Sequence, residues 1–186
     1  SYSPVSAIGT ANAPITITSV KPGKARGTFA VVGAGSEKSY FHYVTVEYGG
    51  TAYINGAFFS GALALHSSDV EIKNSQFKYA FGDDGLNIKN AKADITGSLF
   101  YKNSMDGIDF DFIKSGTVSN NKFIENGGDG FDVSGTDVLF TGNTVQKSGD
   151  KCISIGEKSL NTIRRYIKFN PSMWAYDSDN PGATRL

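Results

Sequence analysis

Acidic residues recur at two fixed places of a phrase that is repeated between Gly82 and Ile155. The phrase reads Asp106-Gly-Ile-Asp-Phe110 and Asp129-Gly-Phe-Asp-Val133, with looser copies at Gly82-Asp-Asp-Gly-Leu-Asn-Ile88 and Asp150-Lys-Cys-Ile-Ser-Ile155. If the copies stack as neighbouring strands, their carboxylates lie about 4.8 Å apart. Such charges repel by on the order of 3 kcal/mol per pair at an effective dielectric constant near 20. The stack therefore needs a bound cation, protonated carboxyl groups, or carboxylates that cap backbone donors.

The first place in the phrase defines a corner column of Asp84, Asp106 and Asp129. An aspartate before a glycine is an ordinary turn residue that bonds to nearby backbone, so a structural role and a functional role are equally compatible with this column. Asp84 and Asp106 are candidate catalytic acids or bases. Lys151 continues the column, where it is a candidate base for a lyase or a salt-bridge partner.

The second place defines a mid-strand column, in which Asp109 and Asp132 follow Asn87. Aspartate is disfavoured in the middle of a strand, so a functional role is favoured there. With Lys89, these three residues are the predicted substrate-binding set. Hard oxygen ligands favour Ca²⁺ among metal ions. The predicted ligands of this ion are Asp84, Asp106, Asp109, Asp129 and Asp132.

A second repeated phrase sets the period of the chain. Ile72 and its equivalents at positions 95, 118 and 140 are spaced by 23, 23 and 22 residues, and each is followed five residues later by a second apolar residue. A fixed period of this size is typical of a solenoid. Alternation of period two within each copy indicates short strands, and coils of this length must pair them in parallel. We predict an all-β, right-handed parallel β-helix with about 22–23 residues per coil, since parallel crossovers are right-handed.

The repeat also predicts the corners and the core. Asn74, Gly97, Asn120 and Gly142 recur at one place, and both residue types tolerate the left-handed backbone of a sharp corner. The residues predicted to stack inside are Leu63, Leu65, Leu86, Ile88, Ile108, Phe110, Phe131, Val133, Ile153 and Ile155.

The domain organisation follows from where this period holds. Residues 1–159 are predicted to form the β-helix, with irregular first coils in 1–60 and regular coils in 61–159. Residues 160–186 have a different composition and are predicted to be a non-repeat tail or a cap. A long aromatic-rich loop lies around 49–60. Its rings either stack on sugars or pack against the protein, and packing is favoured.

The composition excludes several classes of function. Lys+Arg and Asp+Glu both count 18 in 186 residues, so no overall charge points to nucleic acid. Residues 69–150 nevertheless hold 13 acidic against 8 basic residues. The lone Cys152 excludes an internal disulfide and is predicted to be a buried thiol. No run of 18 apolar residues is present, so we expect no membrane insertion.

The repeated phrases resemble the right-handed parallel β-helix repeat of bacterial extracellular proteins. The resemblance covers about residues 27–159, and that superfamily includes pectate lyases, polygalacturonases, alginate epimerases and surface proteins of unknown activity. Asp83 and Asp84 resemble the Asp-Asp pair of polygalacturonases. The accompanying Asn-Thr-Asp, His-Gly and Arg-Ile-Lys motifs do not occur in the chain, and neither does the epimerase motif Asp-Pro-His.

Two hypotheses about function follow. The first is a secreted or cell-surface module of bacterial type that binds or cleaves an acidic polysaccharide along its Asp-rich face, with possible help from Ca²⁺. The alternative is a non-catalytic structural or adhesive module from a larger surface protein. Short coils leave few loops to build a catalytic cleft, so the sequence leaves catalysis open. Apolar residues in the first coils also predict a homodimer through one open end of the β-helix.

Overall fold

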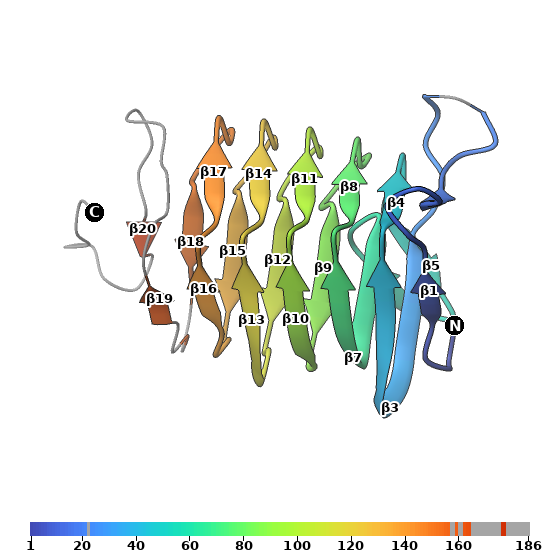
Figure 1. The fold of residues 1–186 in the computed structure, drawn as a ribbon, viewed down its shortest axis with the longest axis horizontal. Helices are drawn as coiled ribbons and strands as arrows, with labels where there is room; N and C mark the ends of the chain where they lie inside the picture. Colours follow the sequence, from blue (N-terminus) through green and yellow to red (C-terminus); the bar gives the residue numbers. More distant parts are fainter. Residues whose placement is uncertain (22, 157–158, 160–161, 165–175, 178–186) are drawn as a thin grey trace.

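The computed structural model describes residues 1–21, 23–156, 159, 162–164 and 176–177. Strands wind into coils that stack along one axis, and no helix occurs in this part of the chain (Figure 1). The inter-coil pairs within the sheets are parallel throughout the described residues. The predicted all-β parallel β-helix is therefore confirmed.

The coil has three sides, two of which belong to one sheet. This sheet has 12 strands among the described residues, because the long strands β3 (Phe29–His42) and β7 (Leu63–Lys73) continue around the corner between two sides. The first side contains the beginnings of β3 and β7 and then β9 (Leu86–Lys89), β12 (Ile108–Asp111), β15 (Phe131–Ser134), β18 (Ile153–Ile155) and β20 (Tyr176–Asp177).

The second side contains the ends of those two long strands. The other strands of this side are β1 (Ser6–Ile8), β10 (Lys92–Thr96), β13 (Ser115–Ser119), β16 (Leu139–Thr141) and β19 (Thr162–Arg164). The third side is a separate sheet of β2 (Ile15–Ile17), β4 (Val44–Glu47), β8 (Gln76–Lys78), β11 (Leu99–Tyr101), β14 (Lys122–Ile124) and β17 (Thr144–Gln146).

The register between coils follows the predicted period. Ile95 lies beside Ile72 on one neighbour and beside Val118 on the other, and Val118 lies beside Phe140. Beyond Ser159 the strands continue at the same spacing, because β19 aligns with β16 and β20 with β18. Most of residues 160–186, the predicted tail or cap, lies outside the described part of the chain.

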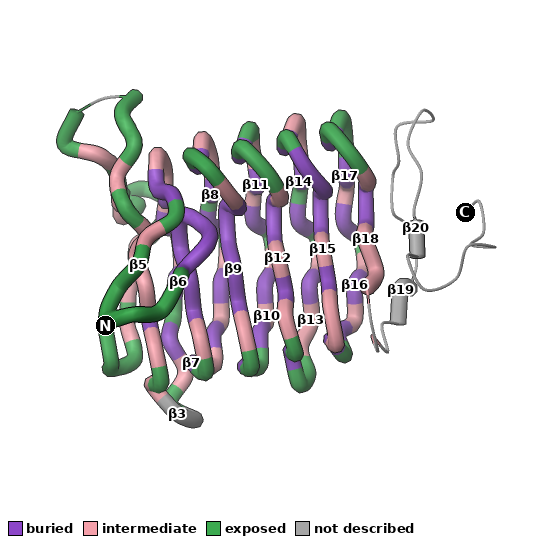
Figure 2. The backbone as a smooth tube through the Cα atoms, turned by 180° about the vertical axis from the view of Figure 1, so that it is seen from behind, coloured by how far each residue is buried: buried purple, intermediate pink, exposed green. Residues whose placement is uncertain are grey.

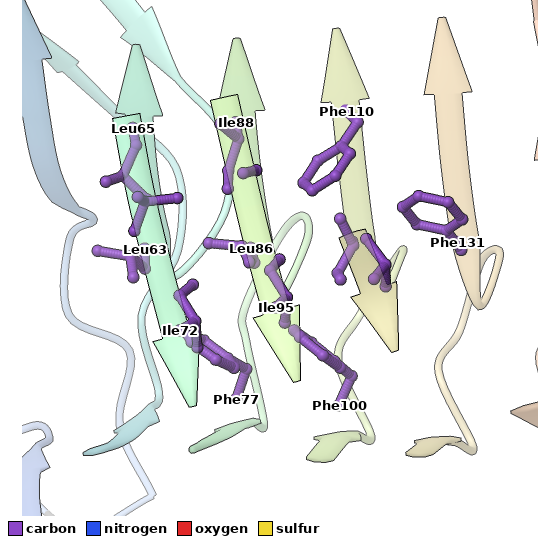
Figure 3. Close-up of a cluster of buried hydrophobic side chains, with 14 of the residues drawn as sticks. Leu63, Leu65, Ile72, Phe77, Leu86, Ile88, Ile95, Phe100, Phe110 and Phe131 are labelled. Atoms are coloured by element: carbon purple, nitrogen blue, oxygen red, sulfur yellow. The ribbon is translucent and has the colours of Figure 1, made fainter. Parts of the chain in front are cut away.

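The core is a set of side-chain stacks that run along the axis (Figure 3). The rings of Phe77, Phe100 and Phe123 are nearly parallel, with centroids 5.0 Å and 4.9 Å apart. Nine of the ten residues predicted to stack inside are buried, and the tenth, Ile155, is half-buried against the core. Cys152 is buried as predicted.

The corners combine left-handed backbone with buried amides. Asn74, Gly97, Asn120 and Gly142 have φ values of 50°, 63°, 56° and 64°, which confirms the predicted corner. Directly after them, a buried ladder runs from Ser98 through Asn121 to Asn143. Asn121 Oδ1 accepts the Ser98 backbone N–H at 2.8 Å, and its Nδ2 donates to Ile95 O and to Asn143 Oδ1, each at 3.0 Å. Buried donors of the corner are thus satisfied between coils.

One insertion departs from the coil pattern. The chain between β4 and β7 forms a hairpin of β5 (Ala52–Ile54) and β6 (Ala57–Phe59), joined by Asn55 and Gly56, which both have positive φ. An Asn-Gly pair of this kind is the favoured two-residue hairpin turn. Figure 2 shows the hairpin at the N-terminal end, on the side formed by β9, β12, β15 and β18.

Candidate functional site

The corner column is tied into the backbone of the next coil. Asp84 Oδ1 accepts the Asp106 backbone N–H at 3.2 Å, Asp106 Oδ1 accepts that of Asp129 at 2.5 Å, and Asp129 Oδ1 accepts that of Lys151 at 2.6 Å. Each carboxyl group therefore caps the following coil, and Lys151 ends the column as the spacing predicted. The bonds take up one oxygen of each of the three aspartates and hold the corner in place.

The Asp-Gly pair requires its glycine for a reason of space. A Cβ on Gly107 would lie 2.5 Å from Gly130 O and 2.8 Å from a ring carbon of Phe123. Any side chain at this position would push neighbouring coils apart, so the glycine lets the corners of successive coils touch. The close stacking brings the aspartates of the corner column within reach of the next backbone N–H.

Burial and neighbouring charge hold protons on these carboxyl groups. Asp84 is only 2% exposed, and burial, followed by repulsion from Asp109 and Asp83, raises its pKa to about 9. Burial also raises the pKa of Asp106 to about 7, although the hydrogen bond from the Asp129 backbone opposes the change. The repulsion expected between stacked carboxylates is therefore reduced by protonation and by backbone hydrogen bonds together.

The mid-strand column forms a row on the outward surface of the first side. Asn87, Asp109, Asp132 and Ser154 lie in direct register on β9, β12, β15 and β18. Asn87 Nδ2 donates to Asp109 Oδ2 at 2.6 Å, and Asn87 Oδ1 lies 3.0 Å from His66 Nε2, which must donate this bond. Asn87 has no exposed surface, so it orients Asp109 from below and does not reach solvent.

A parallel row of outward side chains lies two residues further along each strand. His66, Lys89 and Asp111 follow one another in register, and Lys89 Nζ lies 2.7 Å from Asp111 Oδ2. Burial raises the pKa of Asp109 to about 7, with a further increase from Asp111 and an opposing effect of Lys89. Burial lowers the pKa of His66, which keeps its ring neutral near pH 7. We call Lys89, Asp109, Asp111 and Asp132 the carboxylate face.

Asp109 on this face can exchange protons near neutral pH. A carboxyl group with a pKa of about 7 both donates and accepts hydrogen bonds, which suits the hydroxyl groups of a sugar and also general acid–base chemistry. Asp84, by contrast, lies beneath the surface, and Lys151 forms ion pairs with Asp129 (3.5 Å) and Asp150. Asp84 and Lys151, two of the catalytic candidates, thus make contacts that stabilise the fold. Asp109 and Asp132 lie on the outward face, where a polymer could contact them.

No group of three or more His, Cys, Asp or Glu side chains is arranged to hold a metal ion in the described residues. The oxygens of the corner column that point along the axis are already used by backbone N–H groups. The calcium site stays a prediction. The described part of the chain also contains no helix that could cross a membrane.

The polar interior of the corners and the side-chain contacts around the face escaped the sequence prediction, although Asp111 was expected beside the two aspartate columns. Asn103 and Asn126 form a second buried amide ladder below the corner column, with Asn126 Oδ1 accepting from Asn103 Nδ2 at 3.0 Å. His66 contributes to the site through Asn87, and Asp111 through Lys89. The 23-residue spacing of the two asparagines and the alternation from Asp109 to Asp111 are the signals that could have found them.

Coils of 22–23 residues with parallel strands and inward apolar stacks define a parallel β-helix protein. The family described as the right-handed beta helix region matches residues 32–180. The chain belongs to this right-handed β-helix family, which confirms the predicted superfamily and handedness. No curated protein and no solved structure compared with the chain matches it. The family match includes β19 and β20, beyond the last coil predicted from the sequence.

Proposed function

We propose that this β-helix is a polysaccharide-binding module and that its ligand lies along the carboxylate face. The observation that supports the proposal is the row of Asp109 and Asp132, which are side by side on neighbouring parallel strands and partly open to solvent. Lys89 and Asp111 flank this row as an ion pair. Polar groups repeated at the strand spacing suit a ligand that is itself a repeating chain.

The charge of the carboxylate face affects whether it binds a neutral or an acidic polysaccharide. Because its pKa is raised to about 7, Asp109 can bond to the hydroxyl groups of a sugar without an ion. An acidic polysaccharide, which the sequence favours, brings further carboxylates and needs either Lys89 or a bridging cation such as Ca²⁺ to offset the repulsion. Binding of an acidic polysaccharide should accordingly be stronger with Ca²⁺ than with chelator. Such a ligand also implies a secreted or surface location, which is part of the proposal.

Isothermal titration calorimetry tests the proposal with uronate oligosaccharides and with neutral oligosaccharides, each in Ca²⁺ and in chelator. The double variant Asp109→Asn, Asp132→Asn should weaken binding by about tenfold or more, because it removes two charge-assisted hydrogen bonds. Asp137→Asn is the matched control, since Asp137 is exposed at a corner away from the face. Equal binding by wild type and double variant, or no binding of either class of oligosaccharide, would contradict the proposal.

A structural or adhesive module is the second candidate. It is favoured by the corner column, in which every carboxyl group already caps the next coil and Asp84 is closed to solvent. In that case the aspartates stabilise the solenoid, and the oligosaccharide titrations above give no heat. We assign no catalytic activity to the chain.

A further inference from the structure

We propose that a second site, lined by no charged side chain, binds an acylated sugar ring between strand β3 and the β5–β6 hairpin; the ammonium group of Ser1 at its edge is hydrogen-bonded to Ala30 O at 2.6 Å. The proposal rests on the proposed function for its ligand class, a glycan. It does not use the carboxylate face, so the two sites can be tested separately.

The site is a pocket of about 310 Å³ at the N-terminal end of the first side. Its floor includes the outward-facing residues Ala30 and Val32 of β3, and its wall includes Ile54, Ala57 and Phe59 of the hairpin. This volume is at the lower end of ligand pockets, which is appropriate for one ring and too small for an extended chain.

Phe59 separates the pocket from the carboxylate face. Its side chain is 2% exposed and lines the pocket, and its ring stacks on His66 with centroids 4.6 Å apart. In the hairpin, Ala52 pairs with Phe59 and Ile54 with Ala57, so these residues turn toward the solenoid. Tyr53 and Phe58 form the intervening pair and face away, and they are 79% and 48% exposed. The two surfaces of the hairpin can therefore be altered independently.

The side chains that line the pocket indicate which chemical groups a ligand would need. No charged side chain is among the residues that line the pocket, and small apolar side chains such as Ala30 and Ala57 leave room for a methyl group. Thr28 Oγ1 is buried and has no hydrogen-bond partner among the described residues, a state that costs free energy until a ligand supplies one. At the rim, Asn55 Nδ2 donates to Tyr2 Oη at 2.6 Å, which offers polar contacts to ring hydroxyls.

An acetamido or acetyl group meets each of these features. Its methyl group fits against the alanine and isoleucine side chains, and its carbonyl oxygen can accept the unpaired Thr28 hydroxyl. The hydroxyl groups of the attached ring then remain near Asn55 and Tyr2 at the rim. An unmodified sugar would leave the apolar wall without a methyl group and would bury its own hydroxyls against carbon.

Titration followed by NMR tests the proposal with two probes, the methyl glycosides of N-acetylglucosamine and of glucose. We expect saturable binding of the first and at least tenfold weaker binding of the second. Thr28→Val should weaken binding of the acetylated probe by about fivefold to tenfold, the value of one hydrogen bond. The same change should raise the melting temperature of the free protein, because it removes a buried unpaired hydroxyl. A purely structural threonine would not give both results.

Ala57→Trp should fill the pocket and abolish binding, whereas Tyr53→Ala, on the opposite surface of the same hairpin, should leave it unchanged. Asp109→Asn, Asp132→Asn should also bind the acetylated probe normally, even if it no longer binds a polysaccharide. Absence of saturation by the acetylated probe, equal affinity for both probes, or unchanged binding in Thr28→Val would overturn the proposal.

Discussion

Each carboxyl group in the corner column is subject to two effects that shift its pKa in opposite directions. Asp106 Oδ1 accepts a backbone N–H from the next coil, which favours the charged form, while burial and the neighbouring aspartates favour the neutral form. The second effect is larger, and the pKa of Asp106 rises to about 7. The protein therefore folds with acidic groups that release protons when the chain unfolds at neutral pH.

The stability of the protein should consequently fall as the pH rises. The folded-state pKa values of Asp84, Asp106 and Asp109 are about 9, 7 and 7, above the ordinary value of 3.8. For a pKa raised by folding, the stabilisation is complete below the ordinary value and is lost as pH passes through the raised value. Thermal unfolding measured from pH 4 to pH 9 should show a steady decline in melting temperature.

The variant Asp84→Asn separates this effect from general alkaline denaturation. Asparagine keeps the acceptor oxygen for the Asp106 backbone N–H and cannot ionise, so it should raise stability at pH 8 and flatten the decline. Asp137→Asn, at an exposed position, should leave the profile as it is. A wild-type melting temperature that increases between pH 5 and pH 9 contradicts the assigned protonation.

The buried amide of Asn121 supports a second prediction at this scale. Asn121→Ala should destabilise the fold by about 3 kcal/mol or more, since the Ser98 backbone N–H and Ile95 O would remain buried without their partner. Lys122→Ala, the exposed neighbour, should change stability by less than about 0.5 kcal/mol. Urea unfolding of both variants gives the comparison, and similar losses would show that the ladder has no special importance.

At the scale of elements, each strand from β8 to β19 is only three to five residues long and has little stability alone. What holds the strands is the stacking of equivalent side chains from successive coils, as in the column of Phe77, Phe100 and Phe123, of which Figure 3 labels the first two. Offset or parallel aromatic pairs add about 0.5–1.5 kcal/mol beyond the burial of their area. The middle ring contacts a partner on both sides.

Phe100→Ala should therefore cost about 3–5 kcal/mol of unfolding free energy, through the cavity it leaves and the loss of two ring contacts. Lys114→Ala, an exposed residue at a corner, should be nearly silent. Chemical denaturation with far-ultraviolet circular dichroism measures both. A loss below about 1 kcal/mol in Phe100→Ala would mean that the column relaxes around the gap.

Elements also show where sequence reasoning succeeds. The apolar spacing of Ile72 and Ile95 specifies the parallel register, because a shift by one residue would turn the apolar side chains outward. The same logic correctly aligned Asn87 with Asp109, and His66 with Lys89. The repeat period alone thus predicts which residues of neighbouring strands lie side by side.

The burial of individual outward-facing residues could not be predicted from the repeat period. Asn87 faces outward in the strand pattern and yet is fully buried, next to a surface that Phe59 and the hairpin help to form. The hairpin comes from residues 52–59, outside the repeat, and no period reports where it lies. We expected a long loop here; the Asn55-Gly56 pair is the signal that could have identified the hairpin, but its position over the first side depends on long-range packing.

For the whole molecule, the N-terminal end of the solenoid is where we expect self-association. The N-terminal coil is built from residues 1–17 and the start of β3, and it leaves Tyr2, Ile8 and Val20 exposed by 67%, 57% and 99%. The strands β1 and β2 are the outermost of their sides among the described residues. Exposed strand edges with apolar side chains favour pairing with another chain.

We predict a symmetric homodimer through this end. Light scattering in the micromolar range should give twice the chain mass of 19.9 kDa. Ile8→Asp should shift the protein to monomer, because it places a charge in the contact, while Phe112→Ser removes an exposed aromatic residue from a corner and should not. A monomer at every concentration would show that the end is already covered.

The near-constant coil length has a consequence for how such a chain can change by duplication or loss. Because each coil contacts its two neighbours through the same side-chain columns, removal of one whole coil would bring matching surfaces together. A gain or loss of a single residue inside a strand would instead exchange the inward and outward sets of side chains. The period therefore acts as a reading frame at the level of structure, in which an insertion of 22 or 23 residues leaves the fold intact and lengthens the first side by one strand.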